Sequence, residues 1–528
     1  MATSTSIAAG TGKTWLGHPR GLFLLFFVEM WERFSFYGMR ALLIFYLTQH
    51  FLFSDRDAAY AYGAYMSLIY ISPLMGGYLA DRYLGQRKAV LFGGVVIAIG
   101  HIILGLEGGV ASSGMGLGLF WLGLATVITG TGFLKSSVSA LVGQLYPRAD
   151  MRRDPAYTIF YMGINVGATI GPLICGYLGQ RWGWHWGFGA ASVGMIAGVI
   201  GFVWCKPLLQ GGGEPPDPAR LAQRVGGLIS REWLVYLSSL LSILLCWFLI
   251  QQHAVVGWML AAASALVVLY ILWEAFGRME RVGRDRMLAA LFLLVVNPIF
   301  WGLYEQTGSS LALFTDRYTD RTILGFNVPA SMFQSVNAAY ILLFGPVIAA
   351  LWIWLARRGW EPSTPAKFGL ALALVGAGFL VLVAGSGAPG TLTPLLFIFL
   401  LYLCHTLGEL CLSPVGLSAM SKLAPPRMIG LMMGIWFLAM ALGEYAAGMI
   451  AAATGGEEGA ASREGVLAVY GRIGWWSIGI GLAVMAIAPW VKRLMHLDRL
   501  DDVDVFENAP ADGYAVRDDM AGKPDRLG

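Results

Sequence analysis

The sequence predicts an all-α protein that crosses a membrane about fourteen times. Of its 528 residues, 57% are hydrophobic and only 13% are charged, whereas a soluble domain carries about 25% charged residues. Apolar runs of about 20 residues, the length that a helix needs to cross the hydrocarbon core of a bilayer, recur along most of the chain. The composition therefore excludes a soluble globular domain and predicts a polytopic membrane protein.

Polar or Gly/Pro-containing breaks separate the apolar runs and set the expected helix boundaries. The longest polar interruption within the core is QGGGEPPDPARLAQRVGGLISR, residues 210–231. Six runs precede it, two runs with few polar side chains follow it, and six more complete the chain. In order, we expect helices over residues 21–50, 58–80, 88–108, 115–145, 156–180, 185–205, 233–251, 254–276, 287–314, 330–356, 367–386, 392–422, 428–453 and 473–491.

The same pattern predicts how the chain is divided. The two runs after the interruption form a hairpin that looks added to a core of six plus six helices. The acidic, Gly/Pro-containing C-terminus predicts disorder. We expect an N-terminal tail at 1–20, a first six-helix bundle at 21–205, a linker at 206–232, the additional hairpin and its connecting loop at 233–286, a second six-helix bundle at 287–494 and a disordered tail at 495–528.

Lysine and arginine are distributed unequally between alternate loops. If the N-terminus is cytoplasmic, most of the 36 lysines and arginines fall in cytoplasmic segments and few in outer loops, as the positive-inside rule requires. The first apolar run is too long and too charged to be a cleaved signal peptide. We therefore expect both termini to be cytoplasmic and the first run to remain as a membrane helix.

Several functional classes find no support in the sequence. A net charge of +4 over the whole chain is too small to indicate a basic surface for nucleic-acid binding. The five cysteines lie in apolar segments without metal-ligand spacing, so they are expected to be buried hydrophobic residues and not disulfides. No catalytic motif or phosphate-binding loop is present. We expect neither an enzyme nor a protein that holds a metal or an organic cofactor.

The first apolar run contains an unusual number of charges. The stretch EMWERFSFYGMRALL, residues 29–43, carries Glu29, Glu32, Arg33 and Arg40. Residues three or four apart share a helix face, and each charge at the bilayer centre costs about 2.5–3.5 kcal/mol. An internal salt bridge that only fixes helix packing is one explanation. Two acids beside one base favour another, in which a proton neutralises the spare carboxylate, as a proton-coupled carrier requires.

A further cation lies in the fourth expected helix. Lys135 is roughly midway along the run GTGFLKSSVSALVGQLY, whose small residues permit close helix approach. A lysine that extends to the membrane interface is the alternative interpretation. Its position near the middle of the run favours a site inside the membrane instead.

The charged residues within the cores of the apolar runs of the second half are acidic. Glu305, Glu409 and Glu444 lie in apolar runs without a lysine or arginine in the helix cores, which predicts unpaired acids there. A ligand between the halves would meet cations at one end and carboxylates at the other, as a zwitterion requires. Aromatic walls and amide hydrogen bonds for such a cavity could come from Tyr37, Tyr70, Asn165, Trp301, Asn337 and Trp436.

One histidine leaves two interpretations open. His405 precedes Glu409 by one helical turn, so the two side chains could form a proton-transferring pair. A lone histidine held by some other hydrogen bond is the alternative, and it is the one we favour.

Two motifs carry a resemblance to known families. The segment GGYLADRYLGQRK, residues 76–88, resembles the loop signature of the major facilitator superfamily, in which an acid, a base and a glycine turn link neighbouring helices. The stretch EMWERFSFYGM is more specific, because it is similar to the ExxERFxYY motif of the proton-dependent oligopeptide transporter family. Further similar segments run through residues 20–490, and the additional hairpin resembles that of bacterial members. The loop signature falls on Asp81, Arg82, Gly85, Arg87 and Lys88.

The resemblance implies a fold and a function. It implies two six-helix bundles around a midplane cavity, working by alternating access, and a monomer in the bacterial inner membrane that imports di- and tripeptides with protons. Proton coupling would fall to Glu29, Glu32, Arg33, Lys135 and Glu305. Peptide binding would fall to Arg33, Tyr37, Tyr70, Lys135, Asn165, Trp301, Glu305, Asn337, Glu409 and Trp436.

The sequence departs from the family pattern at two places. Phe36 replaces a tyrosine of the motif, which removes a hydroxyl near the expected carboxylate end. Ser136 and Ser137 replace the Pro-Asn that usually follows the lysine, which could change the bend of the fourth helix. Two other functions stay open at this point, a membrane receptor that binds peptides without moving them and a proton-driven exporter of another solute.

Overall fold

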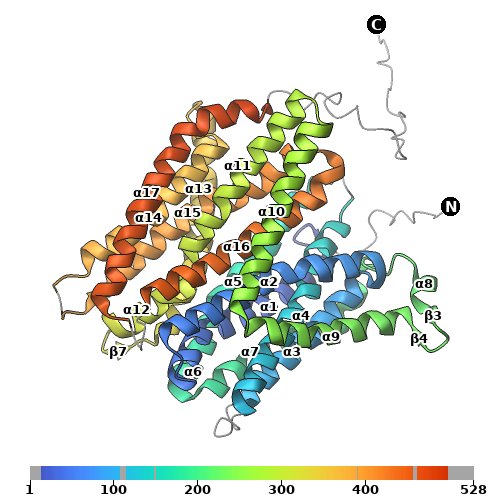
Figure 1. Ribbon diagram of the computed structural model, residues 1–528. Helices are drawn as coiled ribbons and strands as arrows, with labels where there is room; N and C mark the ends of the chain where they lie inside the picture. Colours follow the sequence, from blue (N-terminus) through green and yellow to red (C-terminus); the bar gives the residue numbers. More distant parts are fainter. Residues whose placement is uncertain (1–13, 108–114, 148–149, 389, 456–460, 498–528) are drawn as a thin grey trace.

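The chain is described by a computed structural model over residues 14–107, 115–147, 150–388, 390–455 and 461–497 (Figure 1). Every long element is an α-helix, as predicted, and the strands are short two-residue pairs. Most of the C-terminal tail expected to be disordered, 498–528, lies outside the described residues. All five cysteines are free thiols, as expected.

The first half of the chain forms a group of seven α-helices. Short π-helical turns at Tyr46–His50, Ala80–Leu84 and Pro172–Gly176 extend α1, α2 and α5. The helices are α1 (Arg20–Phe45), α2 (Asp55–Leu79), α3 (Gln86–Glu107), α4 (Met115–Gln144), α5 (Arg153–Gly171), α6 (Tyr177–Trp182) and α7 (Trp184–Cys205), preceded by the strand pair β1 (Thr14–Trp15) and β2 (His18–Pro19).

The linker and the hairpin come next. The linker contains a 3-10 turn at Lys206–Leu209, α8 (Pro218–Ala222) and the antiparallel pair β3 (Arg224–Val225) and β4 (Ile229–Ser230). The hairpin consists of α9 (Arg231–Ile250) and α10 (His253–Arg278). In Figure 1, α9 lies along the first half, where it packs on α4, whereas α10 packs on α11 and α16 of the second half. The hairpin therefore spans both halves.

The second half forms the other group of helices, drawn in yellow-green to red in Figure 1. Its 3-10 turns are Glu305–Gly308, Ala330–Gln334 and Pro426–Met428. Its helices are α11 (Arg281–Tyr304), α12 (Ser310–Tyr318), α13 (Ser335–Arg357), α14 (Thr364–Gly385), α15 (Leu395–Leu423), α16 (Ile429–Thr454) and α17 (Arg463–Leu494). Its strands are β5 (Thr319–Asp320), which pairs in parallel with β8 (Thr393–Pro394), and the antiparallel pair β6 (Thr322–Ile323) and β7 (Phe326–Asn327).

Twelve segments of the described chain are long and apolar enough to cross a membrane. The two remaining long helices, α1 and α2, have 26 and 25 residues and reach across the hydrocarbon core by length alone. They fall short in hydropathy because α1 contains the buried charges and α2 is rich in tyrosine. With them the described chain has fourteen helical segments long enough to cross a bilayer, the number of spans that was expected.

Some helices begin or end away from the expected residues. The last helix, α17, begins at Arg463 and not at 473. Ser462 caps it by accepting a hydrogen bond from the amide of Gly465 at 3.1 Å, which satisfies a free helix-end donor. Arg463 also donates to the carbonyl of Ser386. These polar contacts extend the helix beyond its apolar part, so hydropathy could not reveal its start.

The two halves pack closely along α2 and α16. Gly63 and Gly448 lie against each other, because a Cβ atom built on Gly63 would be 2.8 Å from the Cα of Gly448. Glycine permits this approach of two helix backbones. The division of the chain into the predicted units stays a prediction, but this contact shows where the halves are held together.

Candidate functional site

A cavity of about 660 Å³ lies between the two halves. It reaches the ends of several helices on the side of the molecule where α1 begins, which we call the inner side, because Asp81 at the end of α2 and Leu417 near the end of α15 line it. Most of the predicted site residues come together here. Those that line the cavity are Glu29, Arg33, Tyr37, Tyr70, Asp81, Lys135, Asn165, Trp301, Glu305, Asn337, Glu409 and Trp436.

The charges of α1 form a compact triad at the cavity. The Nε atom of Arg33 lies 3.2 Å from Glu29 Oε1 and also contacts Glu32. All three side chains are buried, and Glu32 lies behind the cavity wall and does not line it. One oxygen of each glutamate has no hydrogen-bond partner among the described residues. The triad thus has two carboxylates on one guanidinium, as the sequence predicted.

Lys135, on α4, contributes to the wall of the cavity. Its ammonium lies 4.1 Å from the centre of the Tyr70 ring, at a distance typical of a cation–π contact. We find no ion pair of Lys135 within the described part of the chain. Its side chain lines the cavity. The helix continues unbroken through Ser136 and Ser137.

The prediction that the acids of the second half are unpaired is wrong for Glu305. Arg40 of α1 forms an ion pair with Glu305 and donates to the hydroxyl of Tyr62 at 2.7 Å. Arg40 and Glu305 are both buried. Sequence spacing could not reveal this pair, because its members come from different halves of the chain. Arg40 was visible only as one more charge in α1, and its importance was missed.

Glu409 has hydrogen bonds but no opposite charge. It accepts from the hydroxyl of Tyr304 at 2.6 Å and from the amide of Asn337 at 3.1 Å. The structure shows no contact that joins Glu409 to His405, whose ring lies 4.9 Å from that of Phe379. The alternative of a His405–Glu409 pair is therefore not realised. Glu409 remains an uncompensated carboxylate in the cavity wall.

The remaining predicted pocket residues differ in whether their polar groups already have partners within the protein. The guanidinium of Arg40 lies 5.7 Å from the centre of the Tyr37 ring. Asn165 donates to the carbonyl of Tyr161 at 3.0 Å, within its own helix. The indole N–H of Trp301 is buried without an acceptor among the described residues, whereas Trp436 is 1% exposed and packs tightly on Gly416. Trp301 therefore has the polar group that a ligand could still use.

The loop signature forms a separate structure at the inner end of α2. Gly85 has φ +73°, and a Cβ atom there would be 2.6 Å from the backbone of Glu214. Arg87 forms an ion pair with Glu214, and Lys88 lies 2.6 Å from Glu232 at the start of α9. The linker and hairpin are therefore fastened to this loop. Arg82, Gly85 and Arg87 do not line the cavity.

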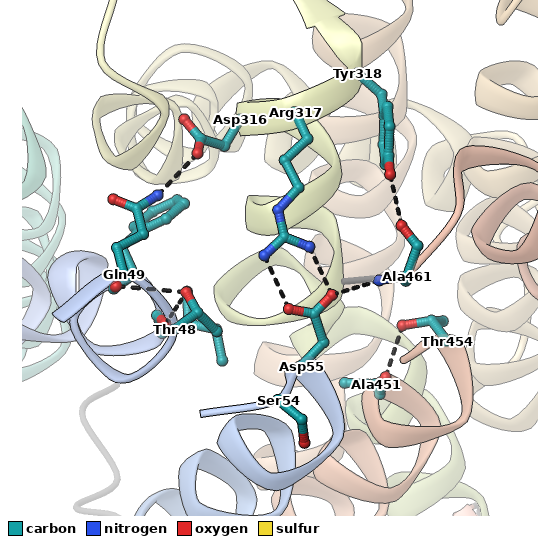
Figure 2. A network of polar contacts seen from close by, with 12 residues as sticks. Thr48, Gln49, Ser54, Asp55, Asp316, Arg317, Tyr318, Ala451, Thr454 and Ala461 are labelled. Atoms are coloured by element: carbon teal, nitrogen blue, oxygen red, sulfur yellow. Dashed lines mark hydrogen bonds and ion pairs between the residues drawn. The ribbon is translucent and has the colours of Figure 1, made fainter. Parts of the chain in front are cut away.

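A polar network joins the halves at the opposite end (Figure 2). Arg317 of α12 donates to both oxygens of Asp55, at 2.6 and 2.8 Å, and the amide of Ala461 donates to Asp55 at 2.8 Å. Figure 2 also shows Gln49 donating to Asp316, at 2.9 Å. The network ties the first turn of α2 to the outer ends of α12 and α17. The halves are thus tied together at this end, opposite the end that the cavity reaches.

Comparison with known proteins decides the family. Residues 87–465 match the model of the POT family, PTR2. The chain belongs to the POT family. It is 37% identical over 490 residues to the peptide transporter YePEPT of Yersinia enterocolitica, covering 85% of this chain and 90% of the relative. It is 30% identical to the dipeptide and tripeptide permease B of Edwardsiella piscicida, covering 94% of this chain and 98% of the relative.

Solved structures agree with this family. The chain is similar to a mutant of peptide transporter POT in complex with alafosfalin, with a TM-score of 0.79 and 34% identity, covering 92% of this chain and 97% of the other. A POT family transporter in complex with 5-aminolevulinic acid gives a TM-score of 0.77 at 30% identity, covering 91% and 98%. The predicted family and fold class are confirmed, and this member of a peptide transporter family is not an enzyme.

Proposed function

We propose that this POT family member imports di- and tripeptides together with protons, as a monomer in a bacterial inner membrane with cytoplasmic termini. The observation that carries the proposal is the charge arrangement of the cavity. Lys135 on the first half and Glu409 on the second half both line it, and neither has an ion-pair partner among the described residues. A bound zwitterion would supply the missing charge at each end.

The peptide is proposed to lie across the cavity in one orientation. Its carboxylate would face Arg33 and Lys135, and its ammonium would face Glu409, with Glu305 nearby. Tyr70 and Trp301 would contact the middle of the peptide. The names of two relatives, a peptide transporter and a dipeptide and tripeptide permease, support this substrate class.

Proton coupling is assigned to the triad of α1. Arg33 can balance only one of the two carboxylates of Glu29 and Glu32, so a proton on one of them removes the remaining buried charge. A proton bound there would be released when the inner side of the cavity is open to water. Lys135 and Glu305 are included in the coupling because both are charged side chains that line the same cavity.

Alternating access follows from the difference between the two ends of the cavity. Because the network around Asp55 and Arg317 ties the halves together at the outer end, we interpret this arrangement as an inward-facing state. The Arg40–Glu305 pair joins the halves at the level of the cavity and would separate when the outer end opens. Asp81, Arg82, Gly85 and Arg87 are proposed to hold the inner loop as the halves rock.

Transport in proteoliposomes tests the function. We expect an inward proton gradient to drive accumulation of a labelled dipeptide, and preloaded dipeptide to support counterflow. A receptor would bind the peptide without counterflow, and an exporter would not accumulate it inward under external acid. Competition by dipeptides and tripeptides, but not by tetrapeptides, free amino acids or nitrate, is the expected specificity.

Blocked dipeptides test the orientation. N-acetylation and C-amidation should each weaken binding to the wild type, because each leaves a buried charge without its partner, at about 1–3 kcal/mol. In Glu409→Gln the penalty for N-acetylation should largely vanish while the penalty for C-amidation remains, and Lys135→Gln should show the reverse. Such double-mutant comparisons cancel a general loss of affinity. Equal sensitivity of both variants to both peptides would contradict the orientation.

A further inference from the structure

A second cavity, of about 410 Å³, lies at the inner end of the second half. The inner ends of α13, α14 and α15 and the residues after α17 surround it, and it shares no lining residue with the central cavity. Its walls are apolar along α13 and α15, where Ile348, Ala349, Leu410 and Val415 line it. It is therefore a separate space with its own chemistry.

The rim of this cavity carries a net positive charge. Lys367 is buried, and its ammonium lies 2.5 Å from Glu361 and 4.5 Å from the centre of the Trp352 ring. These two charges neutralise each other. Lys422, in the last turn of α15, is exposed and has no ion pair within the described ranges. It is the uncompensated cation of the rim.

The cavity also borders the lipid. Only 11% of the most apolar stretch of the α13 segment is buried inside the protein, the lowest share among the twelve candidate spans. A Cβ atom built on Gly345, in the cavity wall, would meet nothing within 4 Å. Apolar chains of the bilayer can therefore reach the space beside α13. A soluble anion would need the cation but not these apolar walls.

We propose that this cavity binds an anionic phospholipid. Its phosphate would contact Lys422 and the hydroxyl of Thr364, and one acyl chain would lie along Ile348 and Val415. Basic pockets between membrane helices on the cytoplasmic side suit anionic headgroups, because each lysine near the surface attracts them. This lipid site is separate from peptide transport, so lipid binding can be tested without a transport assay.

Native mass spectrometry of the full chain in detergent tests the site. Phosphatidylglycerol should bind more tightly than phosphatidylethanolamine, and Lys422→Gln should weaken the tightest phosphatidylglycerol site about fivefold. The matched control is Lys492→Gln, which removes an exposed lysine in the last turn of α17, outside the cavity. It should leave this affinity unchanged.

A second pair of variants tests the apolar walls. Gly345→Leu places a side chain into open space of the cavity and should displace the acyl chain, lowering affinity for either lipid. Gly479→Leu, on α17 with equally open surroundings, should not. Equal affinity of wild type and Lys422→Gln for phosphatidylglycerol would overturn the proposal. Full competition by glycerol 3-phosphate would also overturn the proposal, because a soluble phosphate would then be sufficient for binding. So would phosphatidylglycerol binding that occurs only after residues 498–528 are removed, because that tail would then be the occupant of the cavity.

Discussion

Two groups of buried charges differ in where their members come from. Glu29, Glu32 and Arg33 all belong to α1, so their mutual geometry does not depend on how the halves are placed. The Arg40–Glu305 pair joins α1 to the turn after α11, so it exists only while the halves are together at that level. The triad has a surplus carboxylate, whereas the pair is balanced. We infer that the triad handles the proton and that the pair responds to the conformation.

The polar network around Asp55, like the Arg40–Glu305 pair, joins the two halves, but it lies nearer the surface at the outer end. Asp55 contacts α12 through Arg317 and the start of the α17 segment through Ala461 (Figure 2). At the inner end, an ion pair such as that of Arg87 with Glu214 instead ties the first half to the linker. Opening the outer end must therefore break polar contacts between the halves. Weakening these contacts should change the population of the outward-open state, which can be measured.

Removing one member of the balanced pair should have the largest effect. Arg40→Ala leaves Glu305 buried without its partner, which costs about 3–5 kcal/mol. We expect dipeptide uptake to fall about 10²-fold or more and the thermal unfolding temperature to drop. The double variant Arg40→Gln/Glu305→Gln should recover most of the stability but not the uptake. Near-normal uptake and stability of Arg40→Ala would show that the pair is dispensable.

Breaking the outer network should shift the conformation with a smaller effect. Asp55→Asn removes the charge that holds Arg317, so we expect the outward-open population to rise about tenfold, equivalent to about 1.4 kcal/mol. Spin labels at Leu52 and Leu324, both highly exposed, would report the outer distance in a cysteine-free background. Asp57→Asn, in the same helical turn, is the control. An unchanged distance distribution in Asp55→Asn would remove the network from the mechanism.

The inner loop should tolerate loss of charge but not a change of backbone. Gly85→Ala forces a left-handed residue and a clash with the linker, so it should destabilise the protein by about 1–3 kcal/mol. Glu214→Gln only removes an ion pair whose acid side chain is 58% exposed, worth at most about 1 kcal/mol. Thermal unfolding should rank the two variants in this order. The reverse order would mean that charge, and not close packing, fastens the linker.

The fold was predictable because bilayer crossing leaves a direct signal in the sequence. The apolar runs of α3 to α17 stand out, and the charges of α1 are conspicuous because they interrupt such a run. The start of α17 at Arg463 was missed, since capping by Ser462 and contacts to Ser386 depend on tertiary structure and not on hydropathy.

The site was predictable where its geometry is local. The contact of Arg33 with Glu29 follows from helix spacing, whereas its contact with the adjacent Glu32 does not, since neighbouring residues do not share a helix face. The Arg40–Glu305 pair and the hydrogen bonds of Glu409 with Tyr304 and Asn337 join residues far apart in the chain. Family resemblance pointed to Glu305, but neither spacing nor composition could say that its partner is Arg40. Such partners become visible only when the helices are packed.

Coupling by the triad is the central claim, and Glu32→Gln tests it most directly. This variant removes the surplus acid but leaves Arg33 paired with Glu29. Reconstituted protein should still exchange labelled dipeptide for unlabelled dipeptide, whereas accumulation driven by a proton gradient should be lost. Detergent monodispersity before reconstitution would exclude a folding defect. Full proton-driven accumulation by Glu32→Gln would contradict the account, because the surplus carboxylate would then not be needed to carry the proton.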